Sequence, residues 1–317
     1  MTKKYMKILL DEIMQIPKSA KDCIEKNKKI ILPRNVPYLG MGASYYACLT
    51  LYYCETHIEP FIASEYYHYF SSQKKDLGVL VSQSGESSEI LWNIDKFKKI
   101  IAITNNPGST LAKSPKTKEA ILLHAGIEKF STATKTYVNA LITMYLGLGL
   151  DCAKAIKSLE KNFQGFNEQA RENAENVHLY LSKNKHNGLY IIGSGPNIGT
   201  VMEGALALCE TTKLSWSGLP LGMFDHGPKE TLNNSVVIFL RTKGKDEKRQ
   251  EHLEKLFRKK SNALVMSISD KALPEIVTPI TLVTQIFLFL NYLSDFLKVS
   301  QEKWIGGKVT RVEERLK

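Results

Sequence analysis

A short run of hydroxyl-bearing side chains is the part of this sequence best suited to bind an anion. It follows an apolar stretch, Leu77–Val81, that predicts a buried strand, and it precedes a helix expected to begin at Ser88. At the carboxyl end of a parallel strand, hydroxyls and free backbone amides suit a phosphate. An ordinary serine-rich helix cap is the alternative interpretation. The run consists of Ser82-Gln83-Ser84-Gly85-Glu86-Ser87.

A second strand-to-helix loop, Gly40-Met41-Gly42-Ala43-Ser44, carries related chemistry. Its glycines allow a backbone to approach closely, and the hydroxyl of Ser44 is available to the same phosphate. Taken by itself, this loop is also compatible with a plain helix cap. Neither loop is a P-loop or a dinucleotide fingerprint, since GxxxxGK[ST] and GxGxxG are both missing.

Three further side chains are candidates for proton transfer or carbonyl chemistry. Glu210 follows apolar residues on a predicted helix, where a carboxylate base is favoured, although a solvated glutamate is the alternative. His226 lies in a Gly/Pro turn, where imidazole suits proton transfer, unless it is a surface histidine paired with Asp225. Lys308 follows two glycines near the end of the chain and could cover a ligand, unless that end is simply frayed.

The elements that must position these residues alternate between strand and helix in both halves of the chain. Matching glycine turns occur at Gly40 and Gly193, each between an apolar strand and a helix. This alternation predicts βαβ units, and two sets in tandem predict an α/β fold with two doubly wound, flavodoxin-like parallel sheets. The expected strands lie at 36–39, 77–81, 99–106 and 120–125, and again at 188–193, 235–242 and 262–270. The segment FIASEYYHYF, at 61–70, supplies the end of one more strand and a polar helix.

The expected domain organisation follows from these elements. Residues 1–30 form a lead-in helix that breaks at Pro17, and residues 31–165 and 166–298 form the two domains. Residues 299–317 form a C-terminal tail that carries Lys308. The apolar stretch Ile280–Leu297 is interrupted by polar residues, which favours a buried helix over a membrane span.

Composition excludes several classes of protein. The chain has 317 residues and a formal charge of +11, but its lysine clusters are dispersed and not interleaved with aromatics, so no nucleic-acid partner is expected. Five cysteines without close pairs indicate a reducing compartment, and no cluster suggests a metal. The N-terminus is not a secretory signal, so we expect a cytoplasmic protein without a membrane partner.

The two loops together, in this order and at this separation, resemble the SIS (sugar isomerase) family. The resemblance extends over most of the chain and is closest to the isomerase half of glucosamine-6-phosphate synthase. Stand-alone glucosamine-6-phosphate deaminases and fructosamine-6-phosphate deglycases are similar too. The segments that carry it are SQSGES at 82–87, GMGASYYA at 40–47, Ser131-Thr132-Ala133-Thr134-Lys135, Glu203-Gly204-Ala205-Leu206, His226-Gly227-Pro228 and Gly306-Gly307-Lys308-Val309-Thr310.

The resemblance implies a role for each matching position. It gives Glu210 the proton transfer between sugar carbons C1 and C2, His226 the ring opening from a neighbouring subunit of a homodimer, and Lys308 the open-chain carbonyl, directly or as a Schiff base. It implies no cofactor. It assigns the phosphate to Ser44, Ser82, Gln83, Ser84 and Ser87, and further substrate contacts to Ser131, Thr132, Ala133 and Glu203.

The sequence departs from the family pattern at three points, one of which is Glu302-Lys303-Trp304-Ile305 in place of the family's proline-containing approach to the tail glycines. Ala207 stands where isomerising relatives carry a lysine, which leaves deaminase, deglycase and isomerase activities open. The chain starts Met1-Thr2 without the cysteine nucleophile of a glutaminase domain, so we expect no ammonia transfer from glutamine. The leading hypothesis is a glucosamine-6-phosphate deaminase, and a fructosamine-6-phosphate deglycase is the first alternative. A non-catalytic phosphosugar sensor is the second, although no helix-turn-helix segment is evident.

Overall fold

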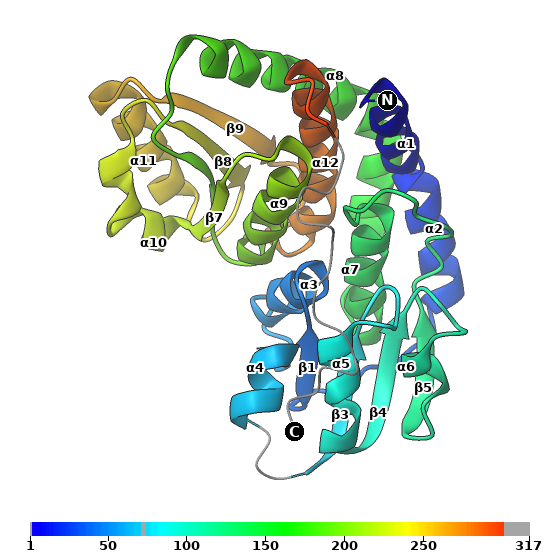
Figure 1. The fold of residues 1–317 in the computed structure, drawn as a ribbon. Coiled ribbons are helices and arrows are strands. Elements are labelled where there is room, and N and C mark those ends of the chain that lie inside the picture. Colours follow the sequence, from blue (N-terminus) through cyan, green and yellow to red (C-terminus); the bar gives the residue numbers. More distant parts are fainter. Residues whose placement is uncertain (1, 71–73, 301–317) are drawn as a thin grey trace. The chain divides into compact units, whose positions relative to one another are not determined.

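The computed structural model describes residues 2–70 and 74–300, which form two compact units (Figure 1). The sheet A unit comprises Ser19–Glu128 and Lys135–Asp151. The sheet B unit comprises residues 2–18 and 152–300 together with Lys129–Thr134, a short segment inserted from the middle of the chain. The division is therefore not a simple cut in the sequence. The boundaries expected at residues 30, 165 and 298 remain predictions.

The sheet A unit is built on five parallel strands in the order β2-β1-β3-β4-β5. Two of its helices, α3 and α7, pack against each other, and the aliphatic core of the sheet includes Leu39, Leu80 and Ile100. The strands are β1 (Pro37–Gly40), β2 (Glu59–Ile62), β3 (Lys75–Val81), β4 (Phe97–Thr104) and β5 (Thr117–Leu122). The helices are α2 (Ile16–Asn27), α3 (Ala43–Tyr52), α4 (Ala63–Glu65), α5 (Ser88–Trp92), α6 (Thr110–Lys113) and α7 (Lys135–Gly147).

The sheet B unit is built on four parallel strands in the order β7-β6-β8-β9. Helix α12 is its buried centre and packs against α8, α9 and α1. The strands are β6 (Leu189–Gly193), β7 (Trp216–Pro220), β8 (Val236–Thr242) and β9 (Leu264–Asp270). The helices are α1 (Thr2–Met14), α8 (Ala153–Lys183), α9 (Asn197–Thr212), α10 (Leu221–Asp225), α11 (Glu247–Lys260) and α12 (Thr278–Phe296).

The two all-parallel sheets confirm the predicted fold class. The break at Pro17 is also confirmed, because α1 ends at Met14 and α2 begins at Ile16. Helix α12 lies where a buried helix was expected. The segment Glu275–Phe296 is long and apolar enough to span a membrane, but 89% of its most apolar window is buried inside the protein. The sequence pattern did not indicate strand β7 or helix α10.

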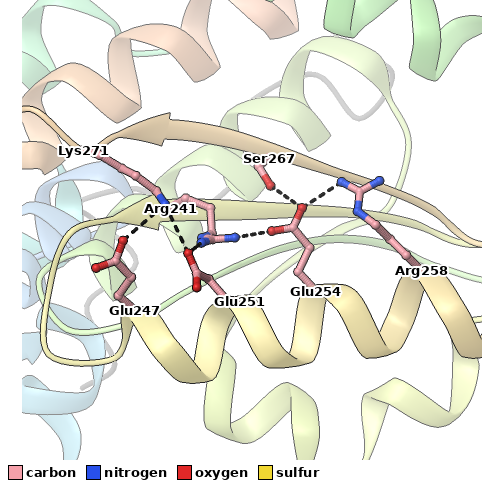
Figure 2. A network of polar contacts seen from close by, with 7 residues as sticks. All are labelled: Arg241, Glu247, Glu251, Glu254, Arg258, Ser267 and Lys271. Atoms are coloured by element: carbon pink, nitrogen blue, oxygen red, sulfur yellow. Dashed lines mark hydrogen bonds and ion pairs between the residues drawn. The ribbon is translucent and has the colours of Figure 1, made fainter.

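A network of charged side chains fastens α11 to strands β8 and β9 (Figure 2). Arg241 on β8 is buried and pairs with both Glu251, at 2.9 Å, and Glu254. Glu254 also accepts hydrogen bonds from Arg258, at 2.8 Å, and from the hydroxyl of Ser267 on β9, at 2.9 Å. Burial raises the pKa of Glu254, but these three partners outweigh burial and hold the pKa below its usual value.

This arrangement predicts an acid-sensitive component of stability. Because the pKa of Glu254 is lower in the folded than in the unfolded chain, its contribution is complete above the unfolded value and is lost as pH falls through the folded value. Chemical denaturation at pH 7 should show Glu254→Gln less stable by about 1–2 kcal/mol. The difference should shrink steadily toward pH 3. Glu175→Gln, on the exposed face of α8, is the control, and an equal loss in both variants would contradict the assignment.

Candidate functional site

The connections of sheet A diverge at its carboxyl edge, between β1 and β3. Strand β1 lies beside both β2 and β3, so the chain leaves β1 toward one side of the sheet and returns to β3 on the other. Such a switch point opens a crevice above the strand ends, where ligands bind in this class of fold. The two loops that sequence analysis selected, 40–44 and 82–87, follow these two strands.

The loop after β3 is a tight turn held by its own hydroxyls. Ser82 is buried, and its Oγ donates to the Oγ of Ser87 at 3.2 Å and accepts from the backbone N–H of Gly85 at 3.1 Å. The Oγ of Ser84 accepts from the N–H of Glu86 at 3.1 Å. Gly85 takes a left-handed conformation with φ +66°. The loop thus places Ser82, Ser84 and Ser87 in one turn, which suits an anion with several oxygens.

Neighbouring segments pin the same loop from outside. The carbonyl of Gln83 accepts from the hydroxyl of Thr104, at 3.1 Å, and from the N–H of Asn105, at 2.9 Å. The carboxylate of Glu86 accepts from the N–H of Thr110 at 2.7 Å. A cavity of about 430 Å³ adjoins Gln83 at the ends of β4 and β5. The loop is therefore fixed before any ligand arrives, which limits the entropy cost of binding.

The loop after β1 depends on a close approach of strand and helix. A Cβ on Gly40 would lie 2.4 Å from the backbone nitrogen of Tyr45, so only glycine permits α3 to begin directly above the strand. Gly42 precedes the helix with φ 49°. Ser44 lies in the first turn of α3 and is half-buried. Its contact with a phosphate remains a prediction.

In the sheet B unit, Glu210 on α9 is held by a residue from the middle of the chain. The hydroxyl of Thr132 donates to Oε2 of Glu210 at 2.7 Å, and Thr132 itself is only 1% exposed. A buried donor of this kind fixes the orientation of the carboxylate. Two of the predicted site residues, 78 positions apart, therefore meet in the fold.

A buried carboxylate in α1 holds the segment that supplies Thr132. Glu12, 4% exposed, accepts hydrogen bonds from the backbone N–H groups of Lys129 and Phe130. The neighbours of Thr132 in this segment are Ser131, which is exposed, and Ala133, which is half-buried. Sequence analysis missed Glu12, and the buried polar position on an otherwise apolar helix face is the signal that could have revealed it.

Three other residues of α9 bear on the site. Glu203 is buried, and Ala207 has no exposed surface. The full burial of Ala207 weighs against an open space at that position for a larger amine. Lys213 ends the helix with φ 57°, and its Nζ donates to the backbone carbonyl of Glu210 at 2.6 Å. This ammonium, one turn beyond Glu210, caps the helix C-terminus.

The two remaining catalytic candidates are His226 and Lys308, of which the structure describes only His226. His226 follows α10 and is exposed, whereas its neighbour Asp225 bonds to Lys229, at 2.9 Å, and to Arg249, at 3.3 Å. The hydrogen bond from Lys229 is the largest influence that lowers the pKa of Asp225. The alternative of a histidine paired with Asp225 is thus weakened. Lys308 lies outside the described residues.

Sheet B has a switch point of its own, between β6 and β8, but a side chain of the protein already fills it. The carboxylate of Glu275 accepts from the hydroxyl of Thr242, at 3.1 Å, and from the N–H of Lys245, at 3.2 Å. A Cβ on Gly244 would lie 2.1 Å from this carboxylate. At the switch point of sheet B, the carboxylate of Glu275 thus occupies the place that corresponds to the serine loop at the switch point of sheet A.

The part of the chain that the structure describes contains no group of three or more His, Cys, Asp or Glu side chains able to hold a metal ion. None of the five cysteines forms a disulfide, and four of them are buried. Burial raises the pKa of Cys48 to about 12 and that of Cys23 to about 11. Thiols with raised pKa values are poor nucleophiles at neutral pH, so Cys23 and Cys48 are not suited to nucleophilic catalysis.

The two all-parallel sheets define a tandem flavodoxin-like fold. Comparison with known families adds that residues 29–147 match the SIS domain model. The chain therefore contains a SIS domain, which includes the five strands of sheet A.

Among curated proteins, a glutamine–fructose-6-phosphate aminotransferase (isomerizing) of Sulfolobus acidocaldarius is 30% identical over 256 residues, covering 74% of this chain and 42% of the relative. The corresponding protein of Thermococcus kodakarensis is 28% identical, covering 84% of this chain and 49% of the relative. The chain thus spans about half or less of the length of the curated relatives it matches.

Solved structures agree on the fold. The C-terminal domain of glucosamine-fructose-6-phosphate aminotransferase from Francisella tularensis superposes with a TM-score of 0.77 at 18% identity, covering 93% of this chain and 98% of that one. Glucosamine-6-phosphate deaminase from Thermotoga maritima gives a TM-score of 0.74 at 20% identity, with 91% and 95% covered. At these identities the likeness establishes the tandem architecture alone.

The turn at Gly85 offers a sharp test of the serine loop. In Gly85→Ala, the new Cβ would lie 2.2 Å from Oγ of Ser109 at a φ that disfavours side chains, so the loop must shift. We expect affinity for glucose 6-phosphate, measured by calorimetry, to fall roughly tenfold or more. Gly149→Ala is the matched control, because Gly149 has φ +76° but nothing within 4 Å. Equal losses in both variants would point to general strain instead.

The filled crevice of sheet B predicts a gain of binding. In Glu275→Ala, the hydroxyl of Thr242 and the N–H of Lys245 lose their acceptor. Titration with inorganic phosphate should then reveal one more weak site per chain than in the unmodified protein, with Kd of about 1 mM. Glu230→Ala, at an exposed position, should leave the stoichiometry unchanged. An unchanged stoichiometry in folded Glu275→Ala would mean that the crevice has no anion-binding capacity.

Proposed function

We propose that this protein is an enzyme that acts at C1 and C2 of a hexose 6-phosphate, and specifically a glucosamine-6-phosphate deaminase. The observation that carries the proposal is the carboxylate of Glu210 fixed by the buried hydroxyl of Thr132. Proton transfer between adjacent carbons needs one base held in a single orientation, because the same oxygen must reach both carbons. The curated relatives described above are named as isomerizing glutamine–fructose-6-phosphate aminotransferases, and this name supports a hexose 6-phosphate as the substrate class.

The serine loop supplies the anchoring. In the proposal, Ser82, Ser84 and Ser87, with Gln83 and Ser44, bind the phosphate at C6. The phosphate does not react, so its binding energy serves to position the distant carbons. Because the loop is already held by Gly85, Thr104 and Thr110, little of that energy is needed to order it.

The proposed reaction is an isomerisation followed by addition of water. His226 assists opening of the sugar ring, which exposes an aldehyde at C1 and leaves the amine at C2. Glu210 removes the proton from C2 and returns it to C1, while a second proton passes from the amine to the C1 oxygen, so that C1 becomes an alcohol and C2 an imine. Water adds to this imine and ammonia leaves, which yields fructose 6-phosphate. Lys308 is assigned the contact with the open-chain carbonyl, from the family resemblance alone.

A homodimer in the cytoplasm is part of the proposal. The resemblance places His226 in a neighbour's active site, and the exposure of His226 and of Met223, which is 63% exposed, is compatible with a contact there. Two groups that are solvent-exposed in one chain can be covered in an assembly.

The test is release of ammonia from glucosamine 6-phosphate. We expect release in the unmodified protein, and a fall in kcat of about 10²- to 10⁴-fold in Glu210→Gln, because the base is removed and the shape is kept. Thr132→Val should lower kcat by roughly tenfold and alter the pH profile of kcat, since it acts only through Glu210. Lys308→Ala tests the assignment to the tail.

Glu175→Gln on α8 serves as the control and should keep full activity. A protein that binds glucosamine 6-phosphate but releases no ammonia would overturn the deaminase proposal. Release of an amino acid from a fructosamine 6-phosphate would then identify a deglycase. Binding without turnover of either compound would identify a sensor.

A further inference from the structure

The two sheets differ at one border, and the difference leaves a strand edge without a neighbour. In sheet A, β4 is followed outward by β5, whereas in sheet B the strand in the corresponding place, β9, is the last. After Asp270 the chain passes through a short turn at Glu275–Val277 and enters α12 without adding another strand. Within residues 2–70 and 74–300, no strand pairs with the outer backbone groups of β9.

A groove runs along this border, with α8 as its other wall. Two cavities of about 500 and 660 Å³ adjoin each other, and Asn173 on α8 and Ser267 on β9 line both of them. The strand contributes residues 264–269 and the helix contributes residues between Lys161 and Asn184. Helix α8 passes alongside β9 in Figure 1, and the hydroxyl of Tyr180 reaches the carbonyl of Asn262 at 3.1 Å to close one end.

The lining has a consistent chemistry. Carboxamide side chains, which both donate and accept, dominate it and suit the backbone of an extended chain. The charged residues that line the two cavities are all cationic: Lys161, Lys183 and Arg258. Arg258 is already shared with Glu254 at 2.8 Å, so the two lysines supply most of the positive field. The carboxamides are Asn162, Gln169, Asn173, Asn176, Asn184 and Gln285.

We propose that this groove accepts one extended, acidic segment of another polypeptide, which pairs with β9 as a fifth strand of sheet B. Main-chain hydrogen bonds to β9 supply affinity, and carboxylates that reach Lys161 and Lys183 supply preference. The seven residues of β9 correspond to a segment of about 23 Å. A second copy of this chain fits poorly, because the chain itself carries a charge of +11.

The proposal is independent of the catalytic assignment and is tested on the full chain with defined peptides. The probe is a capped nine-residue peptide of alternating valine and glutamate, and the comparison peptides replace glutamate by lysine or place proline at the centre. We expect fluorescence anisotropy to detect the acidic peptide, with affinity for the lysine peptide lower by roughly tenfold or more and none for the proline peptide. Hydrogen exchange should slow at residues 264–270 on binding.

Variants locate the site. Asn173→Trp fills the junction of the two cavities from a half-buried position and should abolish binding while leaving the thermal midpoint unchanged. Lys183→Glu should weaken the acidic peptide, whereas Lys255→Glu, exposed on α11 and outside both cavities, should not. Failure of the acidic peptide to protect β9, or binding that survives Asn173→Trp, overturns the proposal. Self-association that Asn173→Trp abolishes would name a second copy as the occupant and would overturn it too.

Discussion

Both halves of this protein depend on the way in which parallel strands force their connections apart. A switch point arises where the connections from two adjacent strands of a sheet run in opposite directions, and it leaves the carboxyl ends of both strands uncovered. Strands β1 and β3 are such a pair in sheet A, and β6 and β8 are such a pair in sheet B. Backbone N–H groups without partners gather at these ends, so each crevice attracts an acceptor.

The two crevices meet this requirement in different ways. In sheet A, hydroxyls and a left-handed glycine shape a turn whose internal hydrogen bonds are satisfied and whose surface stays polar. In sheet B, the carboxylate of Glu275 occupies the equivalent place and takes two of the donors. The same architecture therefore ends in a hydroxyl-rich turn in sheet A and in an internal carboxylate in sheet B. The difference rests on a single acidic side chain contributed from the turn before α12.

The orientation of Glu210, the proposed base, depends on contacts between parts of the chain that are distant in the sequence. Glu12 in α1 fixes the backbone of the segment Lys129–Thr134, and that segment presents Thr132 to Glu210. Each link is a hydrogen bond from a buried or half-buried group, where an unpaired partner would be costly. The same logic governs Arg241, which is tolerable inside sheet B because Glu251 and Glu254 neutralise it.

The sequence by itself determined the local features. Apolar runs and glycine turns located seven of the nine strands that β1–β9 comprise close to their observed positions, and Pro17 separated α1 from α2. The serine loop was recognisable because its hydroxyls and Gly85 are adjacent in the chain. Features that depend on residues close together in the sequence can be predicted without knowing which segments pack against them.

Only the tertiary structure decided the rest. Strand β7 contains glycine and proline and has no alternating pattern, and a Cβ on Gly218 would lie 2.2 Å from the carbonyl of Val201, so packing against α9 places it. The bonds of Thr132 to Glu210 and of Glu12 to the 129–134 segment join positions 78 and more than 100 residues apart. The bare edge of β9 likewise depends on strand order. Such pairings arise because folding brings together groups whose spacing in the sequence carries no signal.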